Sequence, residues 1–298
     1  MSALEAAPLE VAVTRAPLRA FGAALRRQPL MALGLAILVV LVLIAIFAPL
    51  IAPHPADAGT ATDPANALAA PGHGHLLGTD QLGRDVLTRV LYGARTSPLI
   101  VASVLALSAL VGVPLGILAG ASGGWVDDVI MRITDVFLAF PALLLALALA
   151  TVLRPSAEHA ALAIAVTWWP WYARLARGSA AAIAGRGYIE AARALGAPRR
   201  RVLARHVLPN ALPPTIVQIS LDAAGIMLTA AALSFLGLGA QDPTPEWGLM
   251  VNQGQGLLET NWWVAIPPGA AIVIAAVGFN LLGDGLRTLL DPKARRRW

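Results

Sequence analysis

Long apolar stretches without a charged side chain constrain the fold of this chain more than any other feature. Residues 31–52 and 97–121 contain no Asp, Glu, Lys or Arg. A helix of about 20 apolar residues is long enough to cross the hydrocarbon core of a bilayer. Only 13% of the 298 residues are charged, whereas soluble domains carry about 25%. The chain is therefore predicted to be an all-α polytopic membrane protein.

Four more segments are predicted to be transmembrane helices, which brings the expected number to six. They are residues 129–153, 160–182, 212–238 and 263–282. The segment 160–182 is interrupted by Arg174 and Arg177, whose long side chains can reach the membrane surface. Pro141 lies inside the segment 129–153, where it can bend a helix.

The distribution of basic residues predicts the orientation. With the N-terminus in the cytoplasm, 18 of the 22 Lys and Arg residues fall on the cytoplasmic side, and the outside keeps Arg84, Arg89, Arg95 and Arg154. Cytoplasmic segments of membrane proteins are enriched in Lys and Arg, so both termini are predicted to be cytoplasmic. The first apolar stretch is too long for a cleavable signal, whose apolar part has about 7–15 residues, and is expected to remain as an anchor.

The chain is accordingly divided into five parts. Residues 1–30 form a cytoplasmic N-terminal segment, in which arginines alternate with Leu18, Phe21 and Leu25 as in an amphipathic surface helix; a partly disordered tail before Arg15 is the alternative. The other four parts are a transmembrane helix at 31–52, an extracytoplasmic loop at 53–96, a five-helix core at 97–291 that includes a cytoplasmic loop at 183–210, and a basic tail at 292–298.

A compact charged segment, residues 188–210, separates the fourth and fifth apolar stretches. Residues 188–195 are rich in strong helix formers, Gly196 stands where a helix ends in a left-handed C-cap, and Pro198 suits the first turn of a second helix. That second helix is expected to stop at Pro209. It is expected to have a basic side and an apolar side, formed by Arg199, Arg200, Arg201 and Arg205 and by Val202, Leu203 and Val207. A basic loop that only enforces topology is the alternative interpretation.

The succession Glu190-Ala191-Ala192, Gly196 and Leu208-Pro209 resembles the EAA motif in permease subunits of ATP-binding-cassette importers. His206 stands where many of these permeases have isoleucine. The resemblance implies that the segment is a coupling helix, which inserts into a groove on an ATP-binding subunit. The residues that it implies in this coupling are Glu190, Ala191, Ala192, Leu195, Gly196, Arg200, Leu208 and Pro209.

A second motif precedes the second apolar stretch and begins at His75. Its glycines Gly78 and Gly83 permit turns. The charged residues Asp80, Arg84 and Asp85 are expected to form a cluster of ion pairs outside the membrane, which we call the ion-paired knot. A structural or gating role is favoured over direct contact with substrate for Gly78, Thr79, Asp80, Gly83, Arg84 and Asp85. The motif is similar to the N-terminal signature of C-type permeases of the dipeptide, oligopeptide and nickel family. With the EAA motif, this resemblance covers about residues 31–291.

Three carboxylates fall in or beside the predicted spans. Ionisable groups inside a membrane are costly and are candidates for function. Asp135 and Asp284 lie near predicted cytoplasmic ends, where water can solvate them, but Asp222 lies ten residues after the start of its span at 212. Asp222 is therefore the candidate for a residue of the translocation path or of a contact between helices. The aromatic cluster at 168–172 is expected to be core or interface.

The sequence also excludes several kinds of chemistry. Lys293 is the sole lysine and no glycine precedes it, so the chain has no Gly-Lys-Ser/Thr loop for phosphate. The chain has no cysteine and no His-Glu-x-x-His pattern, and His73 with His75 is too sparse for a metal site. No catalytic residue, metal site or cofactor is therefore expected. The arginines interleave with apolar spans rather than with aromatic residues, which argues against nucleic-acid binding.

The function implied by the resemblance is that of a non-catalytic permease subunit of an ATP-driven, binding-protein-dependent importer of type I, in the inner or plasma membrane of a prokaryote. The implied partners are a homologous second permease, two ATP-binding subunits that hold ATP and Mg, and an extracytoplasmic substrate-binding protein. Di- and oligopeptides are the implied cargo, with nickel chelates as an alternative. The alternative function is a stand-alone secondary transporter or channel, which would need coupling-ion carboxylates or an inverted repeat, and neither is recognisable in the sequence. A membrane-embedded enzyme would need a catalytic constellation near an interface, and none is recognisable.

Overall fold

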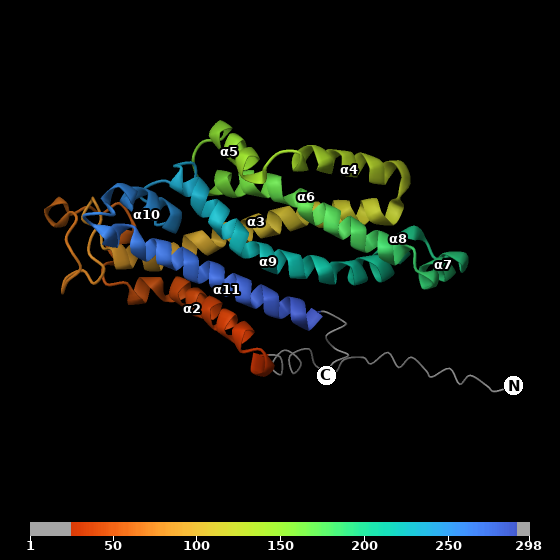
Figure 1. Cartoon of the computed structure of the whole chain (residues 1–298), viewed down its shortest axis with the longest axis horizontal. Coiled ribbons are helices and arrows are strands. Elements are labelled where there is room, and N and C mark those ends of the chain that lie inside the picture. Colours follow the sequence, from red (N-terminus) through yellow and green to blue (C-terminus); the bar gives the residue numbers. More distant parts are fainter. Residues whose placement is uncertain (1–24, 291–298) are drawn as a thin grey trace.

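The computed structural model describes residues 25–290, so the predicted helix around Leu18 and the basic tail at 292–298 lie outside the described residues. Residues 25–290 are mostly helical, and their only extended pairing is one isolated β-bridge between Thr79 and Asp85. Figure 1 shows an elongated bundle in which the long helices run side by side. The all-α class is therefore confirmed for this part of the chain.

Within the described residues, the bundle consists of α2 (Pro29–Ile51), α3 (Val86–Ser122), α6 (Ala157–Ala184), α9 (Leu208–Phe235) and α11 (Ile266–Leu290). Shorter helices are α4 (Gly124–Leu138), α5 (Ala142–Val152), α7 (Gly187–Ala194), α8 (Arg199–Val202) and α10 (Trp247–Gly254). Short 3₁₀ turns are η1 (Pro55–Ala58), η2 (Pro64–Asn66), η4 (Gln255–Leu257) and η5 (Trp262–Val264), and η3 (Leu203–Val207) is a π turn.

The two ends of the bundle carry different connecting segments (Figure 1). The loop between α2 and α3, together with α10 and the start of α11, lies at one end, which we call the α10 end. Helices α7 and α8 lie at the opposite end, which we call the α7 end. The two motifs of the sequence therefore lie at opposite ends of the bundle.

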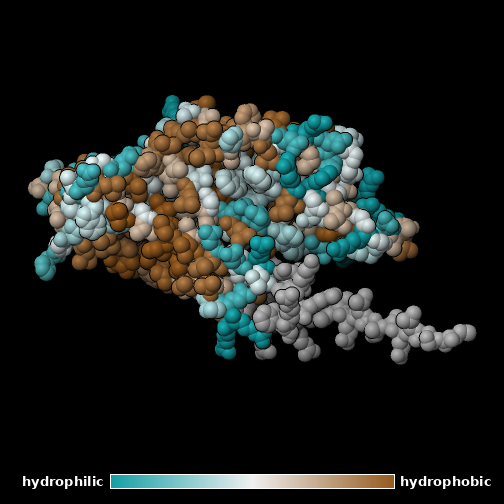
Figure 2. Space-filling model, viewed as in Figure 1, coloured by the Kyte–Doolittle hydropathy of each residue, from teal (hydrophilic) through white to brown (hydrophobic). Residues whose placement is uncertain are grey.

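Helix α2 presents an apolar surface to the outside of the bundle. Pro29 lies in its first turn, where a missing N–H is harmless, and none of its 23 residues is charged. Only 11% of its most apolar 18-residue window is buried. Figure 2 shows the hydrophobic surface that results over α2. An exposed apolar helix of this length fits a position at the lipid boundary.

Helices α3 and α6 pack so closely that α3 needs glycine at three positions. A Cβ added to Gly112, Gly116 or Gly120 would lie 2.3, 2.1 or 2.2 Å from a backbone carbonyl oxygen of α6. Residues four apart lie on one face of a helix, and small residues at this spacing let membrane helices approach closely. This contact holds α6 against the long helix α3.

The predicted third span, residues 129–153, is not one straight helix. It is divided between α4 and α5, which are bent by 84° relative to each other. Pro141 forms the N-cap of α5, and a proline disfavours the helical conformation in the residue before it. Polar side chains of α4 pair with α6, and Asp127 lies 2.6 Å from the guanidinium of Arg177. The bend that the sequence allowed at Pro141 is therefore present, and the predicted span is divided at this proline.

Four helical stretches of the described residues are long and apolar enough to cross a bilayer, or five if α4 and α5 count as one broken span. The four are α2, α3, Arg199–Phe235 and Trp262–Leu289. Helix α6 has 28 residues but contains Arg174 and Arg177, and it is not among them. The number of six spans therefore stays a prediction.

Several helix bounds also differ from those predicted. Helix α3 begins inside the predicted loop 53–96, because Asp85 caps its first turn. Part of the expected loop after α9 forms α10, which Glu246 caps. Helix α11 continues through Gly283 and Asp284, where the sixth span was expected to end. Gly283 lets α11 approach α9, since a Cβ there would lie 2.9 Å from Leu221 Cδ2.

Candidate functional site

Gly196 follows the C-cap of helix α7 and terminates the helix in the manner expected from the sequence. Gly196 has φ +82°, and no atom lies within 4 Å of a Cβ built on it, so the backbone conformation alone favours glycine. The Gly196 N–H donates to Arg193 O at 2.9 Å, and the Ala197 N–H donates to Ala192 O at 3.1 Å. These two bonds form a Schellman motif, which satisfies the last carbonyls of α7. The predicted left-handed C-cap is present.

The predicted helix stop at Pro209 is wrong. Helix α8 passes through the π turn η3 directly into α9, and Pro209 lies in the first turn of α9. The Leu208 N–H donates to Leu203 O, five residues earlier. A π turn widens the helix locally, and the first turn of a helix tolerates a proline without an N–H. The charged segment is therefore continuous with a bilayer-length helix.

One side of the segment 187–207 is buried and the other is exposed. Ile189, Val202 and Val207 are buried in a hydrophobic cluster that also contains Ile183 of α6 and Ala211 of α9. The predicted apolar side is confirmed for Val202 and Val207. Of the residues that the resemblance implies in coupling, Glu190, Ala191, Gly196, Arg200, Leu208 and Pro209 are exposed, Ala192 is half-buried, and Leu195 is 89% exposed.

At the α10 end, Asp80 is the centre of the predicted ion-paired knot. Its Oδ1 accepts the Leu82 N–H at 2.8 Å and the Arg84 N–H at 3.0 Å, and its Oδ2 accepts Arg84 Nε–H at 2.8 Å. Arg84 Nη1 also lies 2.9 Å from Asp242 Oδ1. Arg89, which is 1% exposed, lies 3.7 Å from Asp80 and 3.8 Å from Asp242. The structure therefore brings Asp80 and Arg84 together and adds two partners that the sequence did not indicate.

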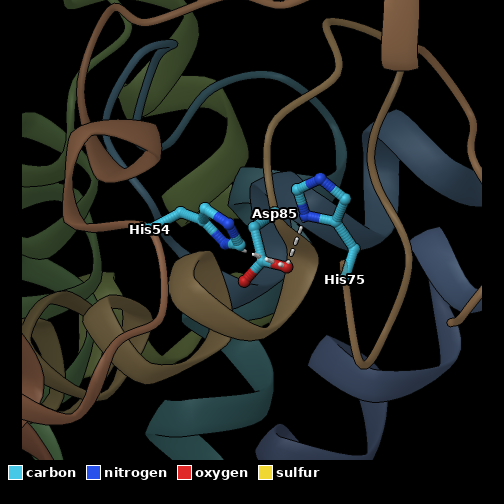
Figure 3. Close-up of side chains that lie close together, drawn as sticks. All are labelled: His54, His75 and Asp85. Carbon is cyan, nitrogen blue, oxygen red and sulfur yellow. Dashed lines mark hydrogen bonds and ion pairs between the residues drawn. The ribbon is translucent and has the colours of Figure 1, made fainter. Parts of the chain in front are cut away.

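Asp85 is not part of this knot. Its Oδ2 accepts the Thr88 N–H at 2.7 Å and so caps α3, as Asp commonly does at a helix start. Its Oδ1 lies 3.0 Å from His75 Nδ1 and 3.8 Å from His54 Nδ1. Figure 3 shows both imidazole rings directed at this carboxylate. The sequence pattern paired His75 with His73, whereas the fold places His75 beside His54.

The glycines of this motif allow the chain to turn back on itself. Gly78 and Gly83 have φ +69° and +77°, and a Cβ on Gly83 would lie 1.8 Å from Asp63 O. Thr79 Oγ1 accepts the Ala69 N–H at 2.8 Å. Trp263 Nε1–H donates to Thr79 O at 3.2 Å. The motif thus joins the α2–α3 loop to the segment before α11.

A third layer of contacts ties α10 to α3. Glu246 Oε1 accepts Ser97 Oγ–H at 3.0 Å, and Trp247 Nε1–H donates to Val90 O at 2.9 Å. A Cβ on Gly93 would lie 2.5 Å from Trp247 Cδ1. Because these partners are about 150 residues apart, no local pattern in the sequence could have indicated them.

A cavity of about 950 Å³ opens between α5, α6 and α9. Its lining is mainly apolar and includes Trp168, Trp171, Arg174, Gln218 and Asp222. Gln218 Nε2–H donates to Asp222 Oδ1 at 2.9 Å, which orients the carboxylate. Two members of the aromatic cluster, which the sequence indicated only as core or interface, therefore line this cavity.

A family model described as binding-protein-dependent transport system inner membrane component matches residues 112–296. The chain belongs to this family. A second model, the N-terminal transmembrane domain of oligopeptide transport permease C, matches residues 17–71 of the permease. The two matches together include α2, the C-terminal part of α3, the charged segment 188–210 and the cavity-lining helices α5, α6 and α9.

Relatives that match more than nine-tenths of the chain agree with this assignment. The probable D,D-dipeptide transport system permease protein DdpC of Escherichia coli is 46% identical, over 91% of this permease and 90% of the relative. The dipeptide transport system permease protein DppC of Escherichia coli is 43% identical, over 95% of this permease and 96% of the relative. The glutathione transport system permease protein GsiD of Pectobacterium atrosepticum is 41% identical, over 91% of this permease and 89% of the relative. The predicted identity as a transport-system permease subunit is confirmed.

A solved structure agrees with the fold of this permease. An inward-facing conformation of the methionine ABC transporter MetNI aligns with a TM-score of 0.55 over 68% of the permease and 96% of that chain. The sequence identity is 19%, so the likeness is one of fold. The fold is therefore that of an ABC importer permease.

Proposed function

We propose that this permease forms one half of the translocation path of an ATP-driven peptide importer and is moved by ATP-binding subunits that dock on α7. In this proposal the chain spans a prokaryotic inner membrane six times, with both termini in the cytoplasm. It is non-catalytic, and two partner subunits bind and hydrolyse ATP with Mg. A homologous permease completes the path, and an extracytoplasmic protein delivers the substrate.

The observation that carries the proposal is the two-sided construction of the segment 187–207. An apolar side chain that is 89% exposed, Leu195, lies at the C-terminus of α7, beside exposed arginines. Exposed apolar side chains with a polar rim are typical of protein–protein interfaces. The opposite side is packed into the same cluster as Ile183 of α6 and Ala211 of α9. A displacement of α7 would therefore be transmitted to two long helices as a rigid body.

The cavity between α5, α6 and α9 supports the assignment of the path. Its volume of about 950 Å³ is within the size range of ligand sites in proteins. Asp222 and Gln218 supply polar groups in a mainly apolar wall, and polar groups inside a membrane most often face such a cavity. Helices α6 and α9, which would respond to α7, form part of the same wall.

The peptide substrate is inferred from the relatives, whose names specify a D,D-dipeptide, a dipeptide and glutathione. We assign the Asp80–Arg84 knot a structural role at the extracytoplasmic face, since both arginines in it are buried and therefore unavailable to a ligand. In this topology the N-terminal segment, the loop 183–210 and the basic tail are cytoplasmic, and the loop 53–96 is extracytoplasmic.

Leu195→Glu tests the docking assignment with little risk to the fold, because the side chain packs on almost nothing. We expect ATP-binding subunits to be lost from the purified complex, and peptide uptake to fall with them. The matched control is Leu76→Glu, which changes a 65% exposed leucine at the α10 end and is expected to keep both. Retention of the ATP-binding subunits and full uptake in Leu195→Glu would refute the docking role.

Asp222→Asn tests the path separately. It keeps the shape of the side chain and its partner Gln218 but removes the charge from the cavity wall. We expect reduced uptake of peptide with the ATP-binding subunits still attached. Uptake by the permease reconstituted alone, without ATP-binding subunits, would instead support a stand-alone transporter or channel.

A further inference from the structure

Three potential metal ligands converge at the α10 end of the molecule. His54 follows α2, His75 belongs to the loop before the second motif, and Asp85 caps α3. One nitrogen of each imidazole and one oxygen of the carboxylate lie within 4.8 Å of one another. Figure 3 shows the two rings on either side of the carboxylate, and their centroids are 4.6 Å apart.

Hydrogen bonding among the three residues leaves one group unexplained. His75 Nδ1 and Asp85 Oδ1 are 3.0 Å apart and satisfy one another. His54 Nδ1 is buried and has no hydrogen-bond partner, and its distance of 3.8 Å from Asp85 Oδ1 is too long for a hydrogen bond. Buried polar atoms without a partner are rare and call for an explanation, such as an ion.

We propose that His54, His75 and Asp85 form a binding site for a divalent first-row transition cation, of which Zn²⁺ is the best match. Two imidazole nitrogens and one carboxylate oxygen are suited to Zn²⁺ and its neighbours in the series, whereas Ca²⁺ and Mg²⁺ prefer sites made only of oxygen. Tetrahedral Zn²⁺ with bonds of about 2.0–2.1 Å separates its ligand atoms by about 3.3 Å. The distances from Asp85 Oδ1 to His75 Nδ1, 3.0 Å, and to His54 Nδ1, 3.8 Å, lie on either side of that value.

The surroundings orient the carboxylate for such a role. Asp85 Oδ2 is held by the Thr88 N–H at 2.7 Å, which leaves Oδ1 directed at the two rings. The backbone N–H of Asp85 donates to Asp57 Oδ2 at 2.8 Å, so a second carboxylate lies close to the site. The side chain of His54 is 40% exposed, which gives an ion and a coordinated water access from solvent. When the ion binds, a proton leaves the His75–Asp85 hydrogen bond.

The ion would join three separate segments of the chain. It would fasten the end of α2 and the α2–α3 loop to the first turn of α3. This role is structural and does not depend on the docking of α7 or on the path, so failure of one proposal leaves the other standing.

Zn²⁺ binding to the intact importer, purified with an affinity tag that contains no histidine, tests the site. The complex is stripped with a chelator and titrated with Zn²⁺ in competition with a chromophoric chelator. His54→Gln removes a ligand whose ring nitrogen has no hydrogen bond to lose. His73→Gln is the matched control, because His73 is exposed in the same loop and lies outside the cluster.

We expect one Zn²⁺ per permease in the wild type and in His73→Gln, with affinity at least roughly tenfold lower in His54→Gln. Zn²⁺ should also raise the thermal midpoint of the wild type and of His73→Gln, but not that of His54→Gln. The proposal is overturned if the wild type takes up no Zn²⁺ under these conditions. It is equally overturned if His54→Gln and the wild type bind Zn²⁺ with the same affinity and stoichiometry.

Discussion

The close contact between α3 and α6 predicts that Gly116→Ala will destabilise the permease, although alanine is the better helix former. A Cβ at this position would lie 2.1 Å from Ala173 O and 2.9 Å from Ala173 C and Cα. All three are backbone atoms of a helix, so no side-chain rotation can relieve the overlap. The two helices would have to move apart by about 1 Å to reach an ordinary carbon–oxygen contact.

The cost of that separation follows from the dispersion energy of the interface. A contact between two carbon atoms is worth about 0.1–0.2 kcal/mol, and a gap of about 1 Å removes about half of it. Every ten contacts across the interface therefore lose about 0.5–1 kcal/mol. Since α3 and α6 face each other over several turns, we expect a loss of about 1–3 kcal/mol, the usual cost of overpacking.

Gly225→Ala is the matched control, because Gly225 lies inside α9, is exposed, and has no atom within 4 Å of a built Cβ. Alanine there should stabilise the helix by up to about 1 kcal/mol. Unfolding of the purified complex by denaturant, followed by tryptophan fluorescence, measures both variants. A Gly116→Ala permease at least as stable as the wild type would refute the reasoning.

The same unfolding assay tests three further predictions, two of which have a control substitution. Gly83→Ala should lower the stability of the complex strongly, because residue 83 has a positive φ and an added Cβ would overlap Asp63 O. Gly74→Ala has open space around it and should be neutral, and equal stability of the two variants would contradict this account. Asp80→Asn should lower the free energy of unfolding by about 3–5 kcal/mol, because it removes the negative charge that pairs with the buried Arg84 and Arg89. Its control is Asp63→Asn, at an exposed hydrogen bond, which should change the free energy of unfolding by less than about 0.5 kcal/mol. Trp247→Phe should cost about 1–2 kcal/mol through the lost Nε1–H bond, and an unchanged unfolding midpoint would show that this bond contributes nothing.

The sequence by itself determined the features that depend on neighbouring residues. The first apolar stretch, predicted at 31–52, forms α2 at Pro29–Ile51, since length and composition suffice for a lone apolar helix. The C-cap at Gly196 was also predictable, because only glycine adopts its φ of +82° at little cost. The EAA-like and Gly78–Asp85 motifs indicated the family for the same reason, because each is a short pattern of fixed spacing.

The tertiary structure decided which distant groups meet. It brought Asp242 to Arg84, His54 to His75 and Asp85, and Gln218 and Asp222 to the same cavity as Trp168 and Trp171. It also determined that Pro141 breaks a span while Pro209 does not. A proline's local restriction is the same at both places, but a π turn absorbs it before α9 and a sharp bend absorbs it before α5. Local sequence fixes conformational preferences, and only the packing of helices far apart in the chain decides how those preferences are satisfied.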